Sequence, residues 1–503
     1  MMQAELQEVA KRGAKFLEVR LDFLAKAIDY PRLIPFKQAA WLATIRRPID
    51  GGRWSGTETD RQVVLRQAIV AGCFDWIDLE TDIADGIRRF GSVKRVISYH
   101  NMVETPADLE VIYDRMRQQD GDVYKLAVMP QSVADVARII AIQKRATKPT
   151  ICFGMGELGF PTRFTALKFG APWIYALFNK DRSLAPGMPA LSDFRTTYPI
   201  RKIDAATKFF GVVGDPVVHS LSPVLHNHLF QRNRINAFYV PCRVPAGQMP
   251  DMAELAREVP FDGLSITIPH KENAAALPLE RDSLVDALGA ANTLAAKGDG
   301  SQFLSNTDYP AILESLRARM DAVAAANGVP PREFGTLGVL VLGAGGAARA
   351  AATALHRAGA TVTIASRTAE RATALATQIG CKAVDWVARH GVTPCDVLIN
   401  ATPVGLAPKT DESPIHVSFL RPELTVFDTV YNPEQTLLIR ESQARGCTVV
   451  TGVEMFVRQA AKQFELFAGV APELDAMRDI VRKAMSPLTS ALDDEAAKSG
   501  MAD

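Results

Sequence analysis

Short apolar runs, separated by polar segments, dominate the first part of the chain. Several of the intervening segments, such as residues 106–119 and 133–145, have the length and composition of a helix. Strands that alternate with helices form parallel sheets. The pattern therefore predicts an α/β fold that begins with the rhythm of a TIM-type (β/α) barrel. The predicted strands are residues 16–21, 41–45, 76–79, 96–99, 123–128, 150–153 and 173–178.

These runs supply seven strands, whereas a closed barrel of this type has about eight. Residues 1–15 are polar and helix-favouring, so the first strand of the barrel is the one that we expect to be missing. Two explanations stay open. Either the coding sequence starts upstream of Met1, or the barrel is open at one edge and exposes unpaired backbone.

Polar side chains gather where the predicted strands end, which is where such barrels carry their chemistry. Lys125 lies within an apolar strand, and burial there lowers the pKa of the amine and favours a Schiff-base nucleophile. The alternative is a lysine at the solvated end of the strand, or one paired with Glu18 or Glu80. His100 ends the preceding strand and can bring an imidazole to the same barrel mouth. The other polar residues at strand ends are Arg20, Asp22, Arg46, Asp50 and Arg163.

A different pattern begins near residues 201–207 and leads into an apolar strand at 208–213. Further on, the apolar run 339–342 is followed by Gly343, Gly345 and Gly346 and then by alanine-rich sequence. Glycines directly after a buried strand let the backbone turn sharply and approach a pyrophosphate at the next helix N-terminus. This predicts a dinucleotide site. Because the third fingerprint position is alanine, an ordinary strand-to-helix turn is the alternative.

The next apolar run, residues 361–365, distinguishes between the two dinucleotides. It ends in Ser366, Arg367 and Thr368, where an NAD site carries an acidic residue. An acidic side chain would repel a 2′-phosphate, whereas a guanidinium pairs with it bidentately. We therefore predict NADP(H) as the cofactor.

Several polar residues of the second half have both a structural and a chemical interpretation. Ser222 precedes a proline and fits a helix N-cap, whereas Ser220 has no such duty, and two hydroxyls beside a helix N-terminus suit a carboxylate ligand. Lys271 falls in a first helical turn against the helix dipole, which requires a carboxylate neighbour or a catalytic duty. Asp308 fits a helix cap and Asn292 a turn when each is considered alone.

Composition narrows the class of protein. With 503 residues the chain needs two or three domains. Its 57 basic and 56 acidic residues are balanced, which argues against a nucleic-acid surface or a polybasic membrane anchor. The six cysteines are scattered without metal-ligand spacing, so we expect free thiols and no metal site. No apolar segment reaches about 18 residues, and we expect a soluble, cytoplasmic protein acting on small molecules.

The strand-end motifs of the first half resemble those of type I 3-dehydroquinate dehydratases. That family forms an imine between a lysine and the substrate ketone and then eliminates water with a histidine as acid and base. The resemblance implies that Lys125 is the Schiff-base lysine and His100 the proton shuttle. It also implies that Glu18, Arg20, Arg46, Asp50 and Arg163 position the substrate, Arg163 at its carboxylate. The motifs are FLEVRLD, RRPIDGG, ISYH, YKLAVM and GELGFPTRF.

One loop departs from that family. Its lid usually reads Ser-Ala-Pro-Gly-Gln, and this chain has Leu184 and Met188 at the two ends, with Ser183 as a partial replacement. Two polar contacts to the substrate are therefore lost or replaced. We expect a weaker Michaelis complex in the dehydratase half.

Residues 208–469 resemble shikimate dehydrogenases. The motifs are GDPVVHSLSP, SITIPHK, GAANT, SNTD, LGAGGAAR, SRT, INATPVG, DTVYNPEQT and GVEMFVRQAA. The resemblance implies an acid/base pair of Lys271 and Asp308, and substrate contacts from Ser220, Ser222, Thr267, Asn292 and Gln459. The cofactor contacts that it implies are Gly343, Gly345, Gly346, Ala347, Arg349, Ser366, Arg367, Thr368, Asn400, Thr402 and Gly452.

Together the two halves predict a bifunctional enzyme that dehydrates 3-dehydroquinate and then reduces 3-dehydroshikimate to shikimate with NADPH. The alternatives are a shikimate or quinate dehydrogenase carrying an inert barrel, and a non-catalytic regulator of quinate metabolism. The predicted domains are a dehydratase barrel (1–204), a substrate-binding domain (205–310), a Rossmann-like NADP domain (311–452), returning C-terminal helices (453–487) and a tail (488–503).

Overall fold

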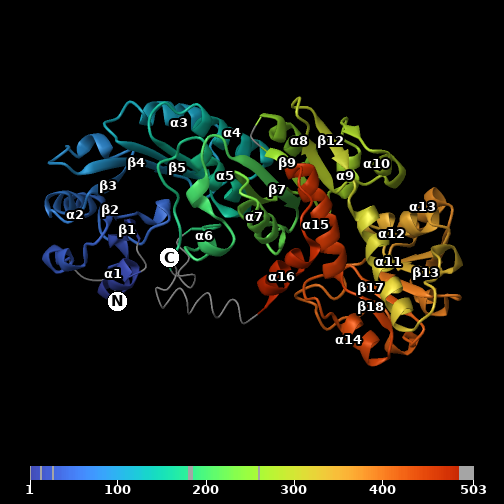
Figure 1. The fold of residues 1–503 in the computed structure, drawn as a ribbon. Coiled ribbons are helices and arrows are strands. Elements are labelled where there is room, and N and C mark those ends of the chain that lie inside the picture. The colour runs from blue at the N-terminus through green and yellow to red at the C-terminus, as the bar shows by residue number, and fades with distance from the viewer. Residues whose placement is uncertain (1, 12–13, 25–27, 179–184, 259–260, 487–503) are drawn as a thin grey trace. The chain divides into compact units, whose positions relative to one another are not determined.

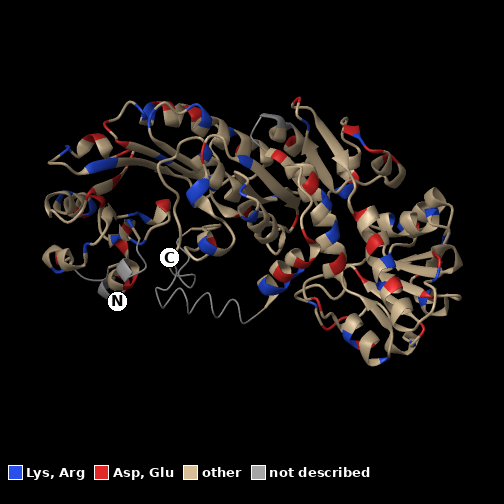
Figure 2. Cartoon of the chain, viewed as in Figure 1, with Lys and Arg blue, Asp and Glu red and all other residues tan. Residues whose placement is uncertain are grey.

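The computed structural model describes residues 2–11, 14–24, 28–178, 185–258 and 261–486, which form two compact units. The first unit contains Met1–Phe209 and Asn236–Pro260, and the second contains Phe210–Ile235 and Phe261–Thr489. The first unit carries the predicted dehydratase half together with residues 236–260, and the second unit carries most of the predicted dehydrogenase half. Figure 2 shows basic and acidic residues interspersed along the elements of both units.

A six-stranded parallel sheet in the order β1-β2-β3-β4-β5-β6 forms the centre of the first unit (Figure 1). All six residues of β5 and all five of β6 are buried, as expected for strands covered on both faces. The strands are β1 (Phe16–Arg20), β2 (Ala40–Thr44), β3 (Trp76–Glu80), β4 (Lys94–His100), β5 (Val123–Val128) and β6 (Thr150–Gly154).

The seventh predicted strand, residues 173–178, is wrong. Leu177 makes only an isolated bridge to Ala190, because its backbone hydrogen bonds go to Pro189 and Leu191 and not to β6. Within the described chain, the sheet is therefore open, with β1 and β6 at its edges.

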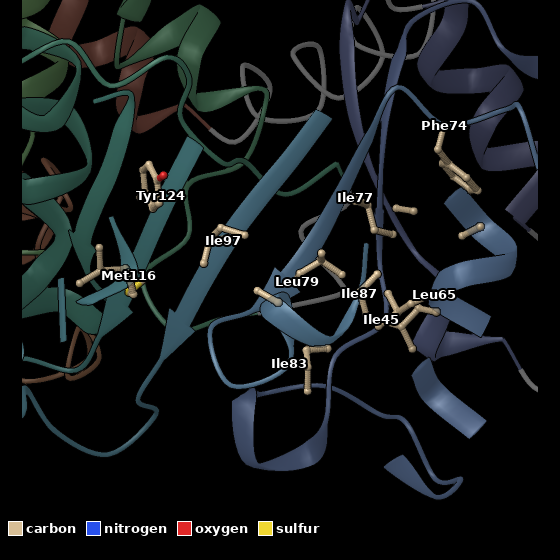
Figure 3. Packing of buried hydrophobic residues seen from close by; sticks show 14 of the residues in the cluster. Ile45, Leu65, Phe74, Ile77, Leu79, Ile83, Ile87, Ile97, Met116 and Tyr124 are labelled. Atoms are coloured by element: carbon tan, nitrogen blue, oxygen red, sulfur yellow. The ribbon is translucent and has the colours of Figure 1, made fainter. Parts of the chain in front are cut away.

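Two helices of the first unit begin at recognisable caps. Thr57 caps α2, and Ser132 forms a capping box with Asp135 at the start of α4. Apolar side chains from α2, α3 and strands β3 to β5 pack in one core, part of which is drawn in Figure 3. The remaining elements of the unit are α1 (Met2–Lys11), α2 (Glu58–Val70), α3 (Leu109–Met116), α4 (Val133–Lys144), α5 (Gly156–Lys168), α6 (Asp193–Thr196), β8 (Ala237–Arg243) and α8 (Met249–Glu258).

The second unit begins with a mixed sheet. Strands β10-β12-β11-β9-β7 lie in this order, and β11 is antiparallel to both of its neighbours. Its elements are β7 (Lys208–Gly214), α7 (Ser222–Arg232), β9 (Phe261–Ile266), α9 (Lys271–Ala275), β10 (Glu280–Arg281), α10 (Ser283–Leu288), β11 (Thr293–Ala296) and β12 (Gln302–Ser305).

A parallel sheet in the order β15-β14-β13-β16-β17-β18 follows. The chain crosses from one side of β13 to the other between β14 and β16, so the carboxyl end of β13 is a topological switch point. The elements are α11 (Asp308–Ala326), β13 (Gly338–Leu342), α12 (Gly346–Arg357), β14 (Thr361–Ser366), α13 (Ala369–Ile379), β15 (Lys382–Asp385), β16 (Val397–Asn400), β17 (Thr425–Asp428), α14 (Leu437–Ala444), β18 (Thr448–Val450), α15 (Gly452–Ala468) and α16 (Leu474–Met485).

This sheet confirms the predicted strand, glycine turn and helix at residues 338–357. None of the helices in the described ranges is long and apolar enough to cross a bilayer. All six cysteines are free, and five of them are buried.

Candidate active sites

A pocket opens at the carboxyl ends of the strands in the first unit. Six residues predicted from sequence line it together: Glu18, Arg20, Arg46, Asp50, His100 and Lys125. Its other lining residues are Gly51, Met102, Ala127, Phe153, Met155, Tyr175, Ala185 and Met188. Six of the polar residues that were predicted to lie at strand ends thus line one cavity.

Lys125 lies in the middle of β5 with only 6% of its surface exposed. Its Nζ is 3.6 Å from Oδ2 of Asp78 and 4.3 Å from the centre of the Tyr175 ring. Burial lowers the pKa of Lys125, while Glu18 and Asp78 oppose that shift. The alternative of a lysine paired with Glu80 is wrong, because Glu80 binds two arginines. The lysine is a buried amine with a depressed pKa, as a Schiff-base nucleophile requires.

His100 ends β4, the strand next to β5, and is partly buried. Its Nδ1 has no hydrogen-bond partner in the described ranges. Burial lowers the pKa of His100 well below its ordinary value, and the charges of Arg46 and Lys125 lower it further. At neutral pH the imidazole is therefore uncharged and can accept a proton.

Arg46 is held by two carboxylates, both from β3. Its Nη2 lies 2.7 Å from Asp78 Oδ2, and its Nη1 lies 2.8 Å from Glu80 Oε1. Sequence reasoning missed Asp78 and Tyr175. The available signal for Asp78 was a second acidic residue two positions before Glu80 in a strand that is otherwise apolar.

Two further predicted residues of this pocket are tied to nearby charges. Arg20 donates two hydrogen bonds to Asp22, at 2.9 and 2.8 Å. Asp50 accepts one from Arg47 at 2.6 Å. Glu18 accepts a 2.8 Å hydrogen bond from Thr44, so all three of these pocket residues are held in place.

Arg163 of α5 does not line the pocket, but its guanidinium lies 4.4 Å from the Phe153 ring, which does. It donates one hydrogen bond, to the carbonyl of Pro186, and its Nε and Nη1 have no partner among the described atoms. Burial lowers the pKa of Arg163 to about 9. A buried guanidinium with unused donors suits a carboxylate ligand.

The lid loop contributes apolar surface to this pocket. Ala185 and Met188 line it, so the position where the dehydratase family has glutamine presents a thioether. Leu184 and Ser183 lie outside the described residues. The lid that the structure describes offers no side-chain hydrogen-bond donor from Met188.

The second unit brings Lys271 and Asp308 together. The Nζ of Lys271 lies 2.6 Å from Oδ2 of Asp308, and 17% and 3% of the two side chains are exposed. Asp308 is the first residue of α11, and no side-chain hydrogen bond caps this helix. The Asp308 carboxylate therefore pairs with Lys271, the first residue of α9, and the interpretation of Asp308 as a helix cap is wrong.

Asn292 is buried and holds the turn before α11. Its Nδ2 donates to Thr307 Oγ1 at 2.9 Å, and its Oδ1 accepts from the Thr307 N–H and the Thr293 hydroxyl. Gln463 of α15, which sequence reasoning missed, donates to the Asn292 carbonyl at 2.9 Å. Gln459, one turn earlier, donates to the Phe456 carbonyl. Gln463 thereby joins helix α15 to the start of β11.

Ser220 and Ser222 lie at the start of α7. Ser222 is the first residue of the helix and Leu221 occupies the cap position, so the predicted N-cap is wrong by one residue. The reason is that Ser220 Oγ accepts the Ser222 N–H, at 3.3 Å. Burial raises the pKa of Tyr431, and hydrogen bonds with the Leu221 backbone and the Ser220 hydroxyl oppose that shift, so this phenol lies beside Ser220.

Three observations at the carboxyl end of β13 fit a bound dinucleotide. Gly343 has φ 115°, and a Cβ there would lie 2.7 Å from the Ala401 carbonyl. Gly345 faces open space, with nothing within 4 Å of its Cβ position, directly before the N-terminus of α12. A Cβ at Gly346 would lie 2.8 Å from Lys271 Cδ, so the glycine turn lies directly against Lys271.

Other residues predicted to contact the cofactor lie in the first turn of α12 and directly after β14. Arg367 and Thr368 are exposed at the end of β14, and Arg367 has no ion pair with the part of the chain that is described. Arg349 follows Ala347 in the first turn of α12 and donates to Gln378 at 2.8 Å. Arg371, which sequence reasoning missed, lies 2.7 Å from Glu272. A free guanidinium after β14 fits a 2′-phosphate.

Three predicted residues lie at the carboxyl ends of β16 and β18. Asn400 donates to Asp428 at 2.9 Å, and Thr402 donates to Asn400 at 2.7 Å. Gly452 opens α15, where a Cβ would lie 2.3 Å from the Val430 carbonyl. Thr267, at the end of β9, donates its N–H to Val213 at 2.9 Å, and a Cβ at Gly214 would lie 2.6 Å from its methyl group.

Comparison with known families separates the same two halves. The model of type I 3-dehydroquinase matches residues 1–205. The models of the shikimate dehydrogenase substrate binding domain, of shikimate/quinate 5-dehydrogenase and of the shikimate 5′-dehydrogenase C-terminal domain match residues 212–294, 327–405 and 452–482.

Individual proteins show the same similarity. A bifunctional 3-dehydroquinate dehydratase/shikimate dehydrogenase of Arabidopsis thaliana, described as chloroplastic, is 36% identical over 501 residues, covering 96% of this chain and 82% of that protein. An NADP(+) shikimate dehydrogenase of Methanocella arvoryzae is 39% identical over 55% of this chain and 98% of its own length.

Two solved structures match the fold of the dehydrogenase half. Shikimate dehydrogenase of Aquifex aeolicus has a TM-score of 0.50 and 28% identity, over 56% of this chain and 99% of that one. A shikimate dehydrogenase in complex with NADP+ has a TM-score of 0.50 and 30% identity, over 56% and 97% of the two chains.

Proposed function

Because the chain belongs to the bifunctional 3-dehydroquinate dehydratase/shikimate dehydrogenases, with NADP as cofactor, we propose a role for each residue of its two sites. The two activities are consecutive, since 3-dehydroshikimate is the product of the first and the substrate of the second. The proposal concerns which side chains carry each step. The observation on which it rests is the placement of two lysines: Lys125 lines one pocket with His100, and Lys271 lies 2.6 Å from Asp308.

In the dehydratase half, the neutral amine of Lys125 attacks the ketone carbon of 3-dehydroquinate. The ketone oxygen leaves as water, and the resulting imine acidifies the neighbouring C–H bond. His100 accepts that proton and returns a proton to the departing hydroxyl, so that a second water is eliminated. Hydrolysis of the imine then releases 3-dehydroshikimate and the free lysine.

Substrate binding in this half uses the residues around the two catalytic groups. The unused donors of Arg163 meet the substrate carboxylate. Glu18, Arg20, Arg46 and Asp50 face the ring hydroxyls from the pocket wall. The thioether of Met188 in this wall supports a Michaelis complex weaker than one with a polar lid.

In the dehydrogenase half, NADPH supplies the hydride when bound. Charge builds on the ketone oxygen of 3-dehydroshikimate during this transfer, and the pair of Lys271 and Asp308 supplies the proton that the oxygen needs. Ser220 and Ser222 hold the substrate carboxylate, and Thr267, Asn292 and Gln459 its hydroxyls. The phosphates meet the turn at residues 343–349, and Arg367 with Thr368 meets the 2′-phosphate.

Two further proposals concern the domain boundaries and the location of the enzyme in the cell. We propose domains at residues 1–204, 205–310, 311–452 and 453–487, the last supported by the hydrogen bonds of Gln463 to Asn292 and Thr293. We also propose that the enzyme works in the cytoplasm, which the six free thiols support. Cell fractionation tests that location.

Imine trapping tests the dehydratase assignment. Full-length protein is incubated with 3-dehydroshikimate and borohydride, and the labelled peptide is identified by mass spectrometry. The label is expected on Lys125, to be lost in Lys125→Ala, and to persist in a control at the exposed Lys94, Lys94→Ala. Label that persists in Lys125→Ala refutes the assignment. No label in wild type, together with normal reduction of 3-dehydroshikimate, leaves a dehydrogenase with an inert barrel.

A further inference from the structure

A chain of buried charges leads from helix α2 to the amine of Lys125. Arg61 Nη1 lies 2.8 Å from Glu80 Oε2, whose other oxygen lies 2.8 Å from Arg46 Nη1. Arg46 Nη2 lies 2.7 Å from Asp78 Oδ2, and the same oxygen lies 3.6 Å from Lys125 Nζ. Each of these five side chains is at most 7% exposed. Such a network transmits the loss of one member to the others because unpaired charge is costly in the interior.

Arg61 is the end of this chain that is farthest from the amine. It is fully buried, does not line the pocket, and comes from a helix and not from a strand end. Besides Glu80, its guanidinium binds the Ile45 carbonyl at 2.7 Å and both oxygens of Glu58 at 2.9 and 2.8 Å. These bonds fix the guanidinium from three sides. Its position in turn fixes Glu80.

Asp78 is shared unequally between two cations. Its distance to Arg46 is that of a charge-assisted hydrogen bond, whereas 3.6 Å to Lys125 is longer than a hydrogen bond. Ser98 donates to its second oxygen at 2.5 Å and also accepts from Arg46 at 3.0 Å. The carboxylate is therefore hydrogen-bonded to Arg46, and its contact with Lys125 is a longer ion pair without a hydrogen bond.

We propose that Arg61 is a positioning residue of the dehydratase, which anchors Glu80 so that Arg46 retains Asp78 and keeps it from closing on Lys125. The inference rests on the proposed role of Lys125 as the nucleophile. An amine must be unprotonated to attack a ketone, and a carboxylate at hydrogen-bond distance would stabilise the ammonium. Arg61 acts through this chain without touching the substrate.

Loss of Arg61 leaves Glu80 with Arg46 as its one remaining cation. Arg46 then moves toward Glu80, Asp78 is released toward Lys125, and the pKa of Lys125 rises from the depressed value that burial gives it. The other charged or titratable groups that act on the amine stay in place: Glu18, Arg20, His100 and Tyr175. The acid limb of the dehydratase pH profile should therefore move to higher pH, by about one unit.

The test measures dehydratase kcat/KM against pH for the full-length protein and for Arg61→Met. Arg66→Met is the matched control, because Arg66 is on the same helix but exposed, and it binds Gln62 and the Gly86 carbonyl. We expect the acid limb to shift up in Arg61→Met, to shift less in Arg61→Lys, and to be unchanged in Arg66→Met. NADPH-dependent reduction of 3-dehydroshikimate by the same samples reports on the second unit, and circular dichroism reports on folding of the whole chain.

A second variant distinguishes the proposed effect from simple misfolding of Arg61→Met. In Arg61→Met/Glu80→Gln the buried acid that would draw Arg46 away is neutral, so the acid limb should return toward that of wild type. An Arg61→Met profile that is lower in rate at every pH but unshifted would overturn the inference, as would a double variant that stays as shifted as the single one. A wild-type protein without dehydratase activity would instead refute the proposed function on which the inference rests.

Discussion

Replacing Lys271 by methionine tests the acid/base pair of the dehydrogenase half. The substitution keeps an unbranched side chain as far as Cε and removes the cation that lies 2.6 Å from Asp308. The carboxylate of Asp308, with 3% of its side chain exposed, then has no counter-charge from α9. Both catalysis and stability should change, and the structure allows each effect to be sized separately.

The catalytic effect is the loss of the group that delivers a proton to the ketone oxygen. General acid catalysis contributes about 100- to 10,000-fold, so kcat for reduction of 3-dehydroshikimate should fall within that range. The structural effect is the loss of one charge-assisted hydrogen bond, about 2 kcal/mol of unfolding free energy. Because 17% of the lysine side chain is exposed, we expect no more than that.

The assay follows NADPH oxidation at saturating 3-dehydroshikimate, with dehydratase activity of the same sample as an internal standard. Lys297→Met is a matched control, since that lysine pairs with Glu280 at the surface of the same unit. Dehydratase activity should be unchanged in both variants. If Lys271→Met retains kcat within about threefold of wild type, the pair does not deliver the proton and the assignment fails.

Three further substitutions test single residues of the dehydrogenase half. Arg367→Ala should raise KM for NADPH by about 10- to 100-fold and leave KM for NADH unchanged, because one charge-assisted contact to the 2′-phosphate is lost; equal effects on both would refute that role. Gly346→Ala should lower dehydrogenase kcat about 10- to 100-fold, since a Cβ there would lie 2.8 Å from Lys271 Cδ; an unchanged kcat would show that Lys271 shifts freely. Burial raises the pKa of Asp428 from 3.8 to about 6. The folded state therefore binds the proton more tightly, and the free energy of unfolding should fall by about 3 kcal/mol as the pH rises through 4 to 6. In Asp428→Asn, chemical denaturation should show no such fall in the free energy of unfolding. A difference in unfolding free energy between variant and wild type that is the same at every pH would contradict this prediction.

The predictions from sequence succeeded where a residue type has one environment that suits it. The glycine turn after residues 338–342 had to follow a buried strand, and the sheet order confirms that position. The cluster at the strand ends of the first half was predictable because parallel strands bring their carboxyl ends together. Six of its members line one pocket.

The failures share a different cause. Residues 173–178 have the composition of a strand, but Leu177 pairs with residues 189–191, and such tertiary pairing is absent from local pattern. Asp78 was missed because a buried acid in an apolar strand is informative only with its partners, which lie on other strands. Asp308 was assigned a capping alternative because its partner Lys271 is distant in sequence. Ion pairs between residues that are distant in the chain cannot be recognised from the local sequence.

The measurement that tests the account most directly supplies the purified full-length protein with 3-dehydroquinate and NADPH together. Two consecutive sites on one chain predict equimolar loss of both compounds and formation of shikimate. Lys125→Ala should consume no NADPH with 3-dehydroquinate and should consume it normally with 3-dehydroshikimate. Wild-type protein that oxidises NADPH with 3-dehydroshikimate but never with 3-dehydroquinate would contradict the account.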